Sequence, residues 1–248
     1  MTAPGAPVPR GTTPVPPPET SRGQHLPPAH LAAAASAVFG DRLALAQRYV
    51  DLLATSGVER GLVGPRETGR LWERHVLNCA GVAPLCPPGS TVLDVGSGAG
   101  LPGLVVALAR PDLTVTLLEP MQRRVTWLLE VADALGLPVA VVRGRAEQGE
   151  GSRLRADTVT ARAVAPLERL VPWCLPLVRP GGQLLALKGR TAQEELDAAV
   201  PALRAAGATA WEVLRVPLPP GPGEDAAGAG DAPTTLVRVS VRPAGRAR

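Results

Sequence analysis

The sequence predicts an α/β fold in which a mostly parallel sheet of seven strands is covered by helices on both faces. Short apolar segments alternate with segments of helical periodicity from residue 90 onward. Most of these short segments are nearly continuous apolar runs, which is typical of strands buried on both faces. A glycine-rich turn also joins the first strand to a helix, as it does in nucleotide-binding βαβ units.

The composition indicates one α/β domain with flexible segments around it. The 248 residues are 45% hydrophobic, which is enough to bury a substantial core. Residues 1–30 carry nine prolines and few large aliphatic side chains, so we expect a disordered tail. We expect an N-terminal helical extension over residues 31–89 and the sheet domain over residues 90–242. A flexible insert at 217–231 and a basic tail at 243–248 complete the predicted organisation.

The sequence argues against membrane and metal-binding classes. No apolar run approaches the roughly 20 residues needed to span a bilayer. The chain has three cysteines, Cys79, Cys86 and Cys174, and their spacing is not that of a metal site. An odd number of cysteines also does not fit a disulfide framework. We therefore expect a reduced, cytoplasmic, monomeric protein without a metal. The net charge of +4 permits a polyanionic partner but does not demonstrate one.

Two helices are predicted before the sheet. From Leu31 the sequence becomes helical, and Asp41 could cap the segment that follows it. A second helix is predicted from Glu67 to Cys79, where His75 lies on an otherwise apolar face. We expect His75 to be a core or rim histidine that holds a neighbouring backbone group.

Strands and helices then alternate along the chain. After the first strand, which runs from Thr91 to the turn at Gly96, the predicted strands are Thr114–Glu119, Pro138–Val142, Asp157–Ala161, Gln183–Leu187, Ala210–Val216 and Thr234–Val241. The predicted helices are Leu104–Ala109, Gln122–Leu135 and Ala192–Ala206, with a proline-interrupted helical region between Pro166 and Pro176. The last two strands could pair antiparallel at the edge of the sheet. This order predicts the parallel, doubly covered sheet stated above.

The glycine turn after the first strand indicates the cofactor. The segment starting at Gly98 matches the dinucleotide pattern G-x-G-x-x-G, but the strand ends at Gly96, from which the pattern is G-x-G-x-G. Asp94 precedes these glycines, and a carboxylate suits a ligand with an ammonium group better than it suits a pyrophosphate. Pro102 removes one N–H that a pyrophosphate would use. S-adenosylmethionine, which has an ammonium, a sulfonium and no phosphate, meets these requirements.

Ligands in such sheets bind at the carboxyl ends of the strands, so the candidate site residues follow the strands. Glu119 ends the second strand and is placed to accept hydrogen bonds from ribose hydroxyls. The predicted cofactor-binding residues are Asp94, Gly96, Gly98, Leu101, Glu119, Pro120, Met121, Ala146, Glu147 and Arg162. Lys188 follows a later strand and is a further candidate.

Several segments together resemble the RsmG (GidB) family of 16S ribosomal RNA guanine-N7 methyltransferases. They are VLDVGSGAGLPGLVVALARPDLTVTLLEPMQRRVTWL, GRAEQ, TARAVAPL, LLALKG and RHVLNC, within a resemblance that covers roughly residues 40–245. The W-N…N-L-T segment common in the family is absent, and SGVERGLVGPRE stands there. The resemblance implies a Rossmann-like class I S-adenosylmethionine-dependent methyltransferase fold.

The resemblance also implies roles for individual residues. Gly96 and Leu101 would line the cofactor pocket, the segment from Glu119 to Met121 would hold ribose and adenine, and Ala146 and Glu147 would flank the adenine. Arg162 would lie near the methyl donor as the catalytic residue. The residues implied to face RNA are Arg123, Arg124 and Lys188, and the alternative for them is ordinary solvated surface charge.

The expected reaction is methyl transfer to guanine N7 in 16S rRNA or in the 30S subunit. N7 carries a lone pair at neutral pH, so alignment can drive the transfer without a general base. Arg162 could contact the O6/N7 edge or a phosphate, and the alternative is a structural ion pair across the sheet end. Two other functions stay open, an NAD-dependent oxidoreductase and a non-catalytic RNA-binding protein. An oxidoreductase would need a Tyr-x-x-x-Lys or a placed histidine, and Tyr49 is the only tyrosine.

Overall fold

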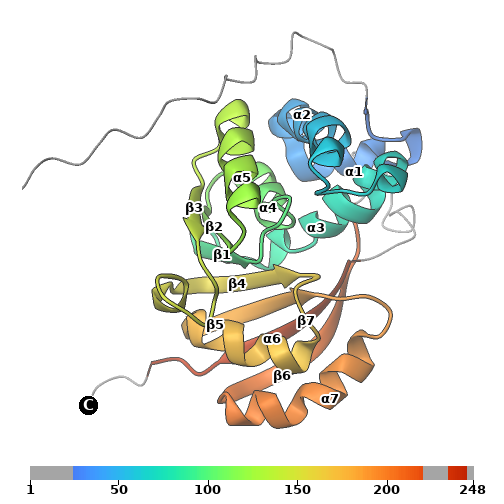
Figure 1. Cartoon of the computed structure of the whole chain (residues 1–248). Helices are drawn as coiled ribbons and strands as arrows, with labels where there is room; N and C mark the ends of the chain where they lie inside the picture. The colour runs from blue at the N-terminus through green and yellow to red at the C-terminus, as the bar shows by residue number, and fades with distance from the viewer. Residues whose placement is uncertain (1–24, 220–233, 245–248) are drawn as a thin grey trace, which may run out of the picture.

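The computed structural model describes residues 25–219 and 234–244. The predicted tail up to residue 24, the predicted insert from residue 220 and the end from residue 245 lie outside the described residues. A seven-stranded sheet with the order β3-β2-β1-β4-β5-β7-β6 forms the centre of the fold (Figure 1). The strands are β1 Thr91–Val95, β2 Thr114–Glu119, β3 Ala140–Arg143, β4 Ala156–Arg162, β5 Val178–Leu187, β6 Ala208–Val216 and β7 Thr234–Val241.

The first five strands pair in parallel, whereas β7 pairs antiparallel with both β5 and β6. The expected antiparallel pair of the last two strands is therefore confirmed. The order differs from the dinucleotide-binding order 3-2-1-4-5-6 because β7 lies between β5 and β6. The apolar side chains Leu236, Val237 and Val239 explain this inner place, since all three are fully buried.

Helices cover both faces of the sheet, as predicted (Figure 1). One face carries α1 Ala29–Phe39, α2 Leu43–Leu52, α3 Asn78–Ala80, α4 Gly103–Ala109 and α5 Gln122–Leu135, and the other carries α6 Leu167–Cys174 and α7 Ala192–Ala205. Successive side chains of a strand point to opposite faces. In β5, Leu185 and Leu187 accordingly pack with the first helical layer, and Leu184 and Ala186 with the second.

The N-terminal extension differs from the prediction in its helix types. Asp41 is not a cap, because it lies in a 3-10 turn, Gly40–Arg42, and makes no side-chain cap hydrogen bond. The segment predicted as one helix from Glu67 is a 3-10 helix, Pro65–Arg70, followed by a π-helix, Leu71–Leu77, and by α3. Gly69 lies inside this segment, and glycine disfavours a continuous α-helix.

Residues 25–30 of the predicted tail are described and are tied to the fold. The His25 backbone N–H and its ring Nδ1 lie 3.1 and 2.9 Å from Asp51 Oδ1, and Trp72 Nε1 donates to the His25 carbonyl. Helix α1 begins at Ala29, directly after Pro28 and two residues before the predicted start.

The strand order places a topological switch point between β2 and β4. Strand β1 pairs in parallel with both. On one side of β1 the sheet continues from β2 to β3, and on the other side it continues from β4 to β5. Ligands of open α/β sheets bind at such a point, beyond the carboxyl ends of the strands. The turn after Val95 and the segments after Glu119 and Arg162 meet at this edge.

Candidate functional site

The turn after β1 has a backbone that requires glycine. Gly96, Gly98 and Gly100 have φ values of 71°, 58° and 104°, in the left-handed region that other residues disfavour. A Cβ atom on Gly96 would also lie 2.7 Å from Cγ2 of Val164 in the loop after β4. The turn is therefore shaped for close approach of backbone and ligand, and it touches the end of β4.

Asp94 lies beneath this turn and is completely buried. Its Oδ2 accepts a 3.0 Å hydrogen bond from the Gly103 N–H, whereas its Oδ1 is buried without a partner among the described residues. Burial raises the pKa of Asp94 to about 7, although the hydrogen bond from the Gly103 N–H opposes the change. The predicted cofactor residue is thus a carboxyl group with an unsatisfied oxygen directly below the glycine turn.

Glu119 connects the ends of β1 and β2. It is 1% exposed, and its two carboxylate oxygens accept hydrogen bonds from the Gly98 N–H at 2.9 Å and the Met121 N–H at 3.0 Å. Each oxygen keeps a further lone pair for a ligand donor. The structure therefore brings together the glycine turn and Glu119, which the sequence predicted separately.

The remaining predicted cofactor residues surround this pair. Leu101 and Pro120 are half-buried, Ala146 is buried, and Met121 and Glu147 are exposed. The Gly144 N–H donates to the Glu119 carbonyl, which holds the segment after β3 against the end of β2.

Two aromatic side chains hold the glycine turn, and sequence reasoning missed this role. The hydroxyl of Tyr49 and the indole N–H of Trp127 both donate to the Ala99 carbonyl, at 3.0 and 2.9 Å. Tyr49 comes from α2 in the N-terminal extension, so the extension directly supports the turn. The only signal in the sequence was that Tyr49 is the single tyrosine of the chain.

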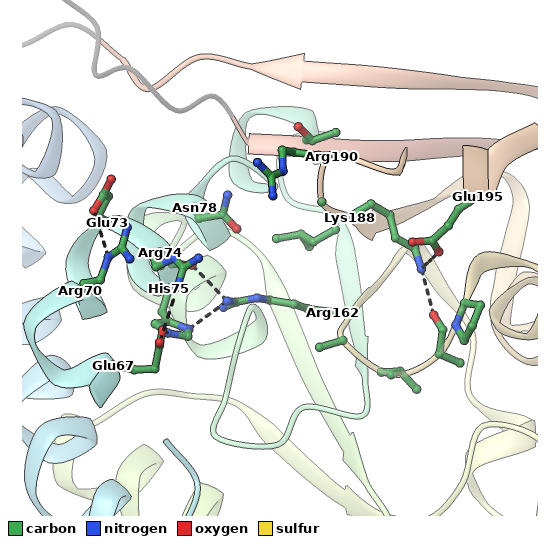
Figure 2. Close-up of a pocket in the computed structure, with 17 residues that line it drawn as sticks. Glu67, Arg70, Glu73, Arg74, His75, Asn78, Arg162, Lys188, Arg190 and Glu195 are labelled. Carbon is green, nitrogen blue, oxygen red and sulfur yellow. Dashed lines mark hydrogen bonds and ion pairs between the residues drawn. The ribbon is translucent and has the colours of Figure 1, made fainter. Parts of the chain in front are cut away.

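A polar cavity of about 1010 Å³ opens beside the turn (Figure 2). The N-terminal extension, the loop after β4 and the end of β5 form its walls. Its charged and polar lining comprises Glu67, Arg70, Glu73, Arg74, His75, Asn78, Arg162, Lys188, Arg190 and Glu195. Val164 lines the cavity and packs against Gly96, so the cavity and the glycine turn are neighbours.

Arg162 ends β4 and points into this cavity (Figure 2). Its guanidinium donates to Cys79 Sγ at 3.1 Å and to the Arg74 carbonyl at 3.1 Å, and lies 2.9 Å from His75 Nδ1. Burial raises the pKa of the Cys79 thiol to about 11, so this sulfur is uncharged. Among the described residues Arg162 has no carboxylate partner, so none of them forms the structural ion pair that was the alternative.

His75 has a different environment from the one expected. Its ring contacts the side chains of Arg162 and Glu67 instead of a backbone group, with Nε2 at 2.9 Å from Glu67 Oε2. Burial is the main reason that the pKa of His75 lies below its usual range. Sequence reasoning found His75 but not this connection to Arg162.

The three residues predicted to face RNA differ in their exposure and in their distance to a carboxylate. Lys188 is only 9% exposed, and its Nζ donates to Glu195 at 2.7 Å and to the Ala165 carbonyl at 2.9 Å. Arg124 lies 3.8 Å from Glu119, whereas Arg123 is exposed at the start of α5.

Residues 25–219 and 234–244 show neither a metal-binding cluster nor a membrane-spanning helix. Within these ranges no three or more His, Cys, Asp and Glu side chains are grouped so that they could hold a metal ion. None of the helices described there is long and apolar enough to cross a membrane. The three cysteines are buried and free.

Solved structures support the fold assignment. A S-adenosylmethionine-dependent O-methyltransferase from Thermotoga maritima aligns with a TM-score of 0.52 at 15% identity, over 73% of this chain and 72% of its own. The predicted class I methyltransferase fold is thereby confirmed.

Sequence comparisons identify the family. The family model GidB, described as rRNA small subunit methyltransferase G, matches residues 42–216. A ribosomal RNA small subunit methyltransferase G from Salinispora tropica is 62% identical over 177 residues, which cover 68% of this chain and 73% of the relative. Another from Renibacterium salmoninarum is 54% identical over 220 residues, 87% of this chain and 97% of the relative. The chain therefore belongs to the GidB family, rRNA small subunit methyltransferase G.

Proposed function

We propose that the protein transfers a methyl group from S-adenosylmethionine to N7 of a guanine in 16S ribosomal RNA. The observation that carries the proposal is the position of Arg162. Its guanidinium has no carboxylate partner among the described residues and faces the cavity. Val164 lies between this cavity and Gly96 of the glycine turn. A methyl donor in the turn and a nucleotide in the cavity would meet at the end of β4.

The residues at the turn fit S-adenosylmethionine. The partnerless Asp94 Oδ1 lies where a cationic ligand would favour the ionised carboxylate. Glu119 retains acceptor capacity for ribose hydroxyls, and the buried Ala146 offers an apolar contact for adenine. When bound, the cofactor supplies a methyl group that its sulfonium activates towards a nucleophile.

The cavity suits a reaction that needs no general base. The carboxylates that line it are already engaged, because Glu67 pairs with His75, Glu195 with Lys188 and Glu73 with Arg70. Guanine N7 needs no deprotonation, since its lone pair is available at neutral pH. Arg162 can donate to guanine O6 and leave N7 free, which would orient the base for in-line transfer.

The expected partner is 16S rRNA, either naked or within the 30S subunit, and the protein is expected to act in the cytoplasm as a metal-free monomer. The exposed Arg123 and Arg190 would contact the RNA backbone beside the site. The two alternatives are not favoured, because the relatives at 51–62% identity are named as rRNA methyltransferases and not as oxidoreductases or non-catalytic proteins.

The proposal is tested with methyl-labelled S-adenosylmethionine and two substrates, a 16S rRNA transcript and 30S subunits rebuilt on that transcript. Both lack prior modification, so the target guanine is available. Digestion to nucleosides and mass spectrometry would show N7-methylguanosine in at least one substrate. Failure of both substrates to acquire label at guanine N7 would rule out the proposal, and their relative rates would identify the preferred one.

A further inference from the structure

Neutral hydrogen-bond acceptors hold the guanidinium of Arg162. All three groups that contact its guanidinium belong to the N-terminal extension, and all are electrically neutral as hydrogen-bond acceptors. A carboxylate partner would fix the guanidinium but would also offset its charge. Neutral acceptors fix its direction and leave the charge available to a ligand in the cavity.

The contact with Arg162 determines the protonation of His75. A guanidinium only donates hydrogen bonds, so the Nδ1 atom 2.9 Å from Arg162 must carry a lone pair. The ring proton is then on Nε2, which donates to Glu67 Oε2 at 2.9 Å. Hydrogen bonding to His75 is the main reason that the pKa of Glu67 is lowered, so Glu67 is an ionised acceptor. Donation therefore runs from Arg162 to His75 and from His75 to Glu67.

The local backbone fixes the ring. His75 lies in the π-helix Leu71–Leu77, in which Leu71, Trp72 and Val76 are buried against the core. Single π-helical turns inside helices occur frequently at functional sites. The neighbouring Arg74 carbonyl supplies a second acceptor for Arg162, so one helical turn provides two of its three contacts.

We propose that His75 is a positioning residue, which with Glu67 holds the Arg162 guanidinium in the direction needed to contact the target nucleotide. This inference rests on the proposed function, because it assumes that Arg162 contacts the nucleotide. It gives the N-terminal extension a part in the reaction beyond its packing on the sheet. Figure 2 shows the side chains of Glu67, His75 and Arg162, which these hydrogen bonds connect, along one wall of the cavity.

Two amide substitutions separate this role from a structural one. In His75→Asn the side-chain oxygen can replace the Nδ1 acceptor, so the contact with Arg162 is kept and the one with Glu67 is lost. In His75→Gln the longer amide can replace the Nε2 donor, so the contact with Glu67 is kept and the acceptor for Arg162 is lost. We expect His75→Gln to methylate roughly tenfold more slowly than His75→Asn in single-turnover reactions, since misaligned groups lose rate steeply.

Further measurements distinguish this positioning role from a general loss of cofactor binding or of structure. S-adenosylmethionine affinity should be equal in the two variants, and in an Arg162→Ala background His75→Gln should cause no additional loss, because it acts only through Arg162. The same two substitutions at His25, whose ring contacts Asp51 outside the cavity, should not differ in rate. Equal rates of His75→Asn and His75→Gln would overturn the inference, as would a loss that follows cofactor affinity.

The ring itself gives a test that does not depend on methylation. The chain has three histidines, so the nitrogen-15 resonances of His75 can be assigned by comparison with His75→Asn. We expect a neutral ring with the proton on Nε2 at pH 7 in the wild-type protein. In Arg162→Ala we expect a higher pKa of His75, because the guanidinium charge that lowers it is gone and Glu67 still accepts from Nε2. A proton on Nδ1, or a doubly protonated ring, would overturn the inference. Absence of methylation by the wild-type protein would instead refute the proposed function.

Discussion

Asp94 is predicted to make the stability of the protein fall as the pH rises. Its pKa increases from 3.8 in the unfolded chain to about 7 in the fold, because the carboxyl group is completely buried. The folded state therefore holds a proton that the unfolded state releases, and stability is lost between pH 4 and 7. At about 1.4 kcal/mol for each pKa unit the full effect is about 4 kcal/mol.

The perturbation that isolates this effect is Asp94→Asn. The amide oxygen can still accept the hydrogen bond from Gly103, but the side chain no longer titrates. We expect the difference in unfolding free energy, variant minus wild type, to rise by about 3 kcal/mol between pH 5 and pH 8. Urea denaturation of both proteins over this range measures it, and taking the difference removes the contributions of all other groups.

A matched control is Asp157→Asn. Hydrogen bonds from Thr91 are the main reason that the pKa of Asp157 is lowered, so this group stays ionised in both states above pH 5. Its difference curve should therefore be flat over the same range. A flat curve for Asp94→Asn as well would refute the reasoning, since it would mean that Asp94 ionises in the fold as readily as in the unfolded chain.

Three further predictions concern the glycine turn. Gly96→Ala should weaken S-adenosylmethionine binding roughly tenfold or more in calorimetry, because φ is positive and the new Cβ has no space. The control Gly61→Ala should leave binding unchanged, since Gly61 has a similar φ of 66° but open surroundings. Glu119→Gln should also weaken binding by roughly tenfold, since an amide NH₂ would face a backbone N–H; unaltered affinity would remove Glu119 from the site. Tyr49→Phe should cost about 1 kcal/mol of unfolding free energy, and Trp127→Phe should cost more because the fully buried indole also loses packing. The two losses should combine more than additively, because only the double variant leaves the buried Ala99 carbonyl without both donors, and strict additivity would contradict a shared role.

The sequence predicted those parts of the fold that depend on local periodicity. Helix α5 and strand β7 have the predicted bounds, because Val125 and Leu128 repeat at helical spacing and apolar residues alternate in β7. Strand β5 begins at Val178 and not at the predicted Gln183, and residues 179–182 interrupt its pairing, since Ala156 pairs with Val178 and Thr158 already pairs with Gln183. Gly181, with φ of 82°, permits this departure from regular strand geometry.

The parts of the site that escaped prediction depend on contacts between distant residues. Arg162 and His75 are 87 positions apart, and nothing local in either segment indicates that they touch. The engagement of Lys188 with Glu195 and Ala165 depends on how α7 packs against the loop after β4. The strand-end rule placed Gly98 and Glu119 correctly side by side, because parallel strands bring their carboxyl ends to one edge.

The central claim is that a nucleotide bound beside Arg162 receives a methyl group at guanine N7. The most direct measurement compares wild type and Arg162→Ala for two quantities, S-adenosylmethionine affinity by calorimetry and single-turnover formation of N7-methylguanosine in 16S rRNA. Although Arg162 was also predicted as a cofactor-binding residue, its guanidinium contacts Cys79, Arg74 and His75 at the cavity. We therefore predict that the affinity changes by no more than about threefold and that the transfer rate falls by roughly a hundredfold. Equal transfer rates in the two proteins, or methylation by wild type at a different atom, would contradict the account.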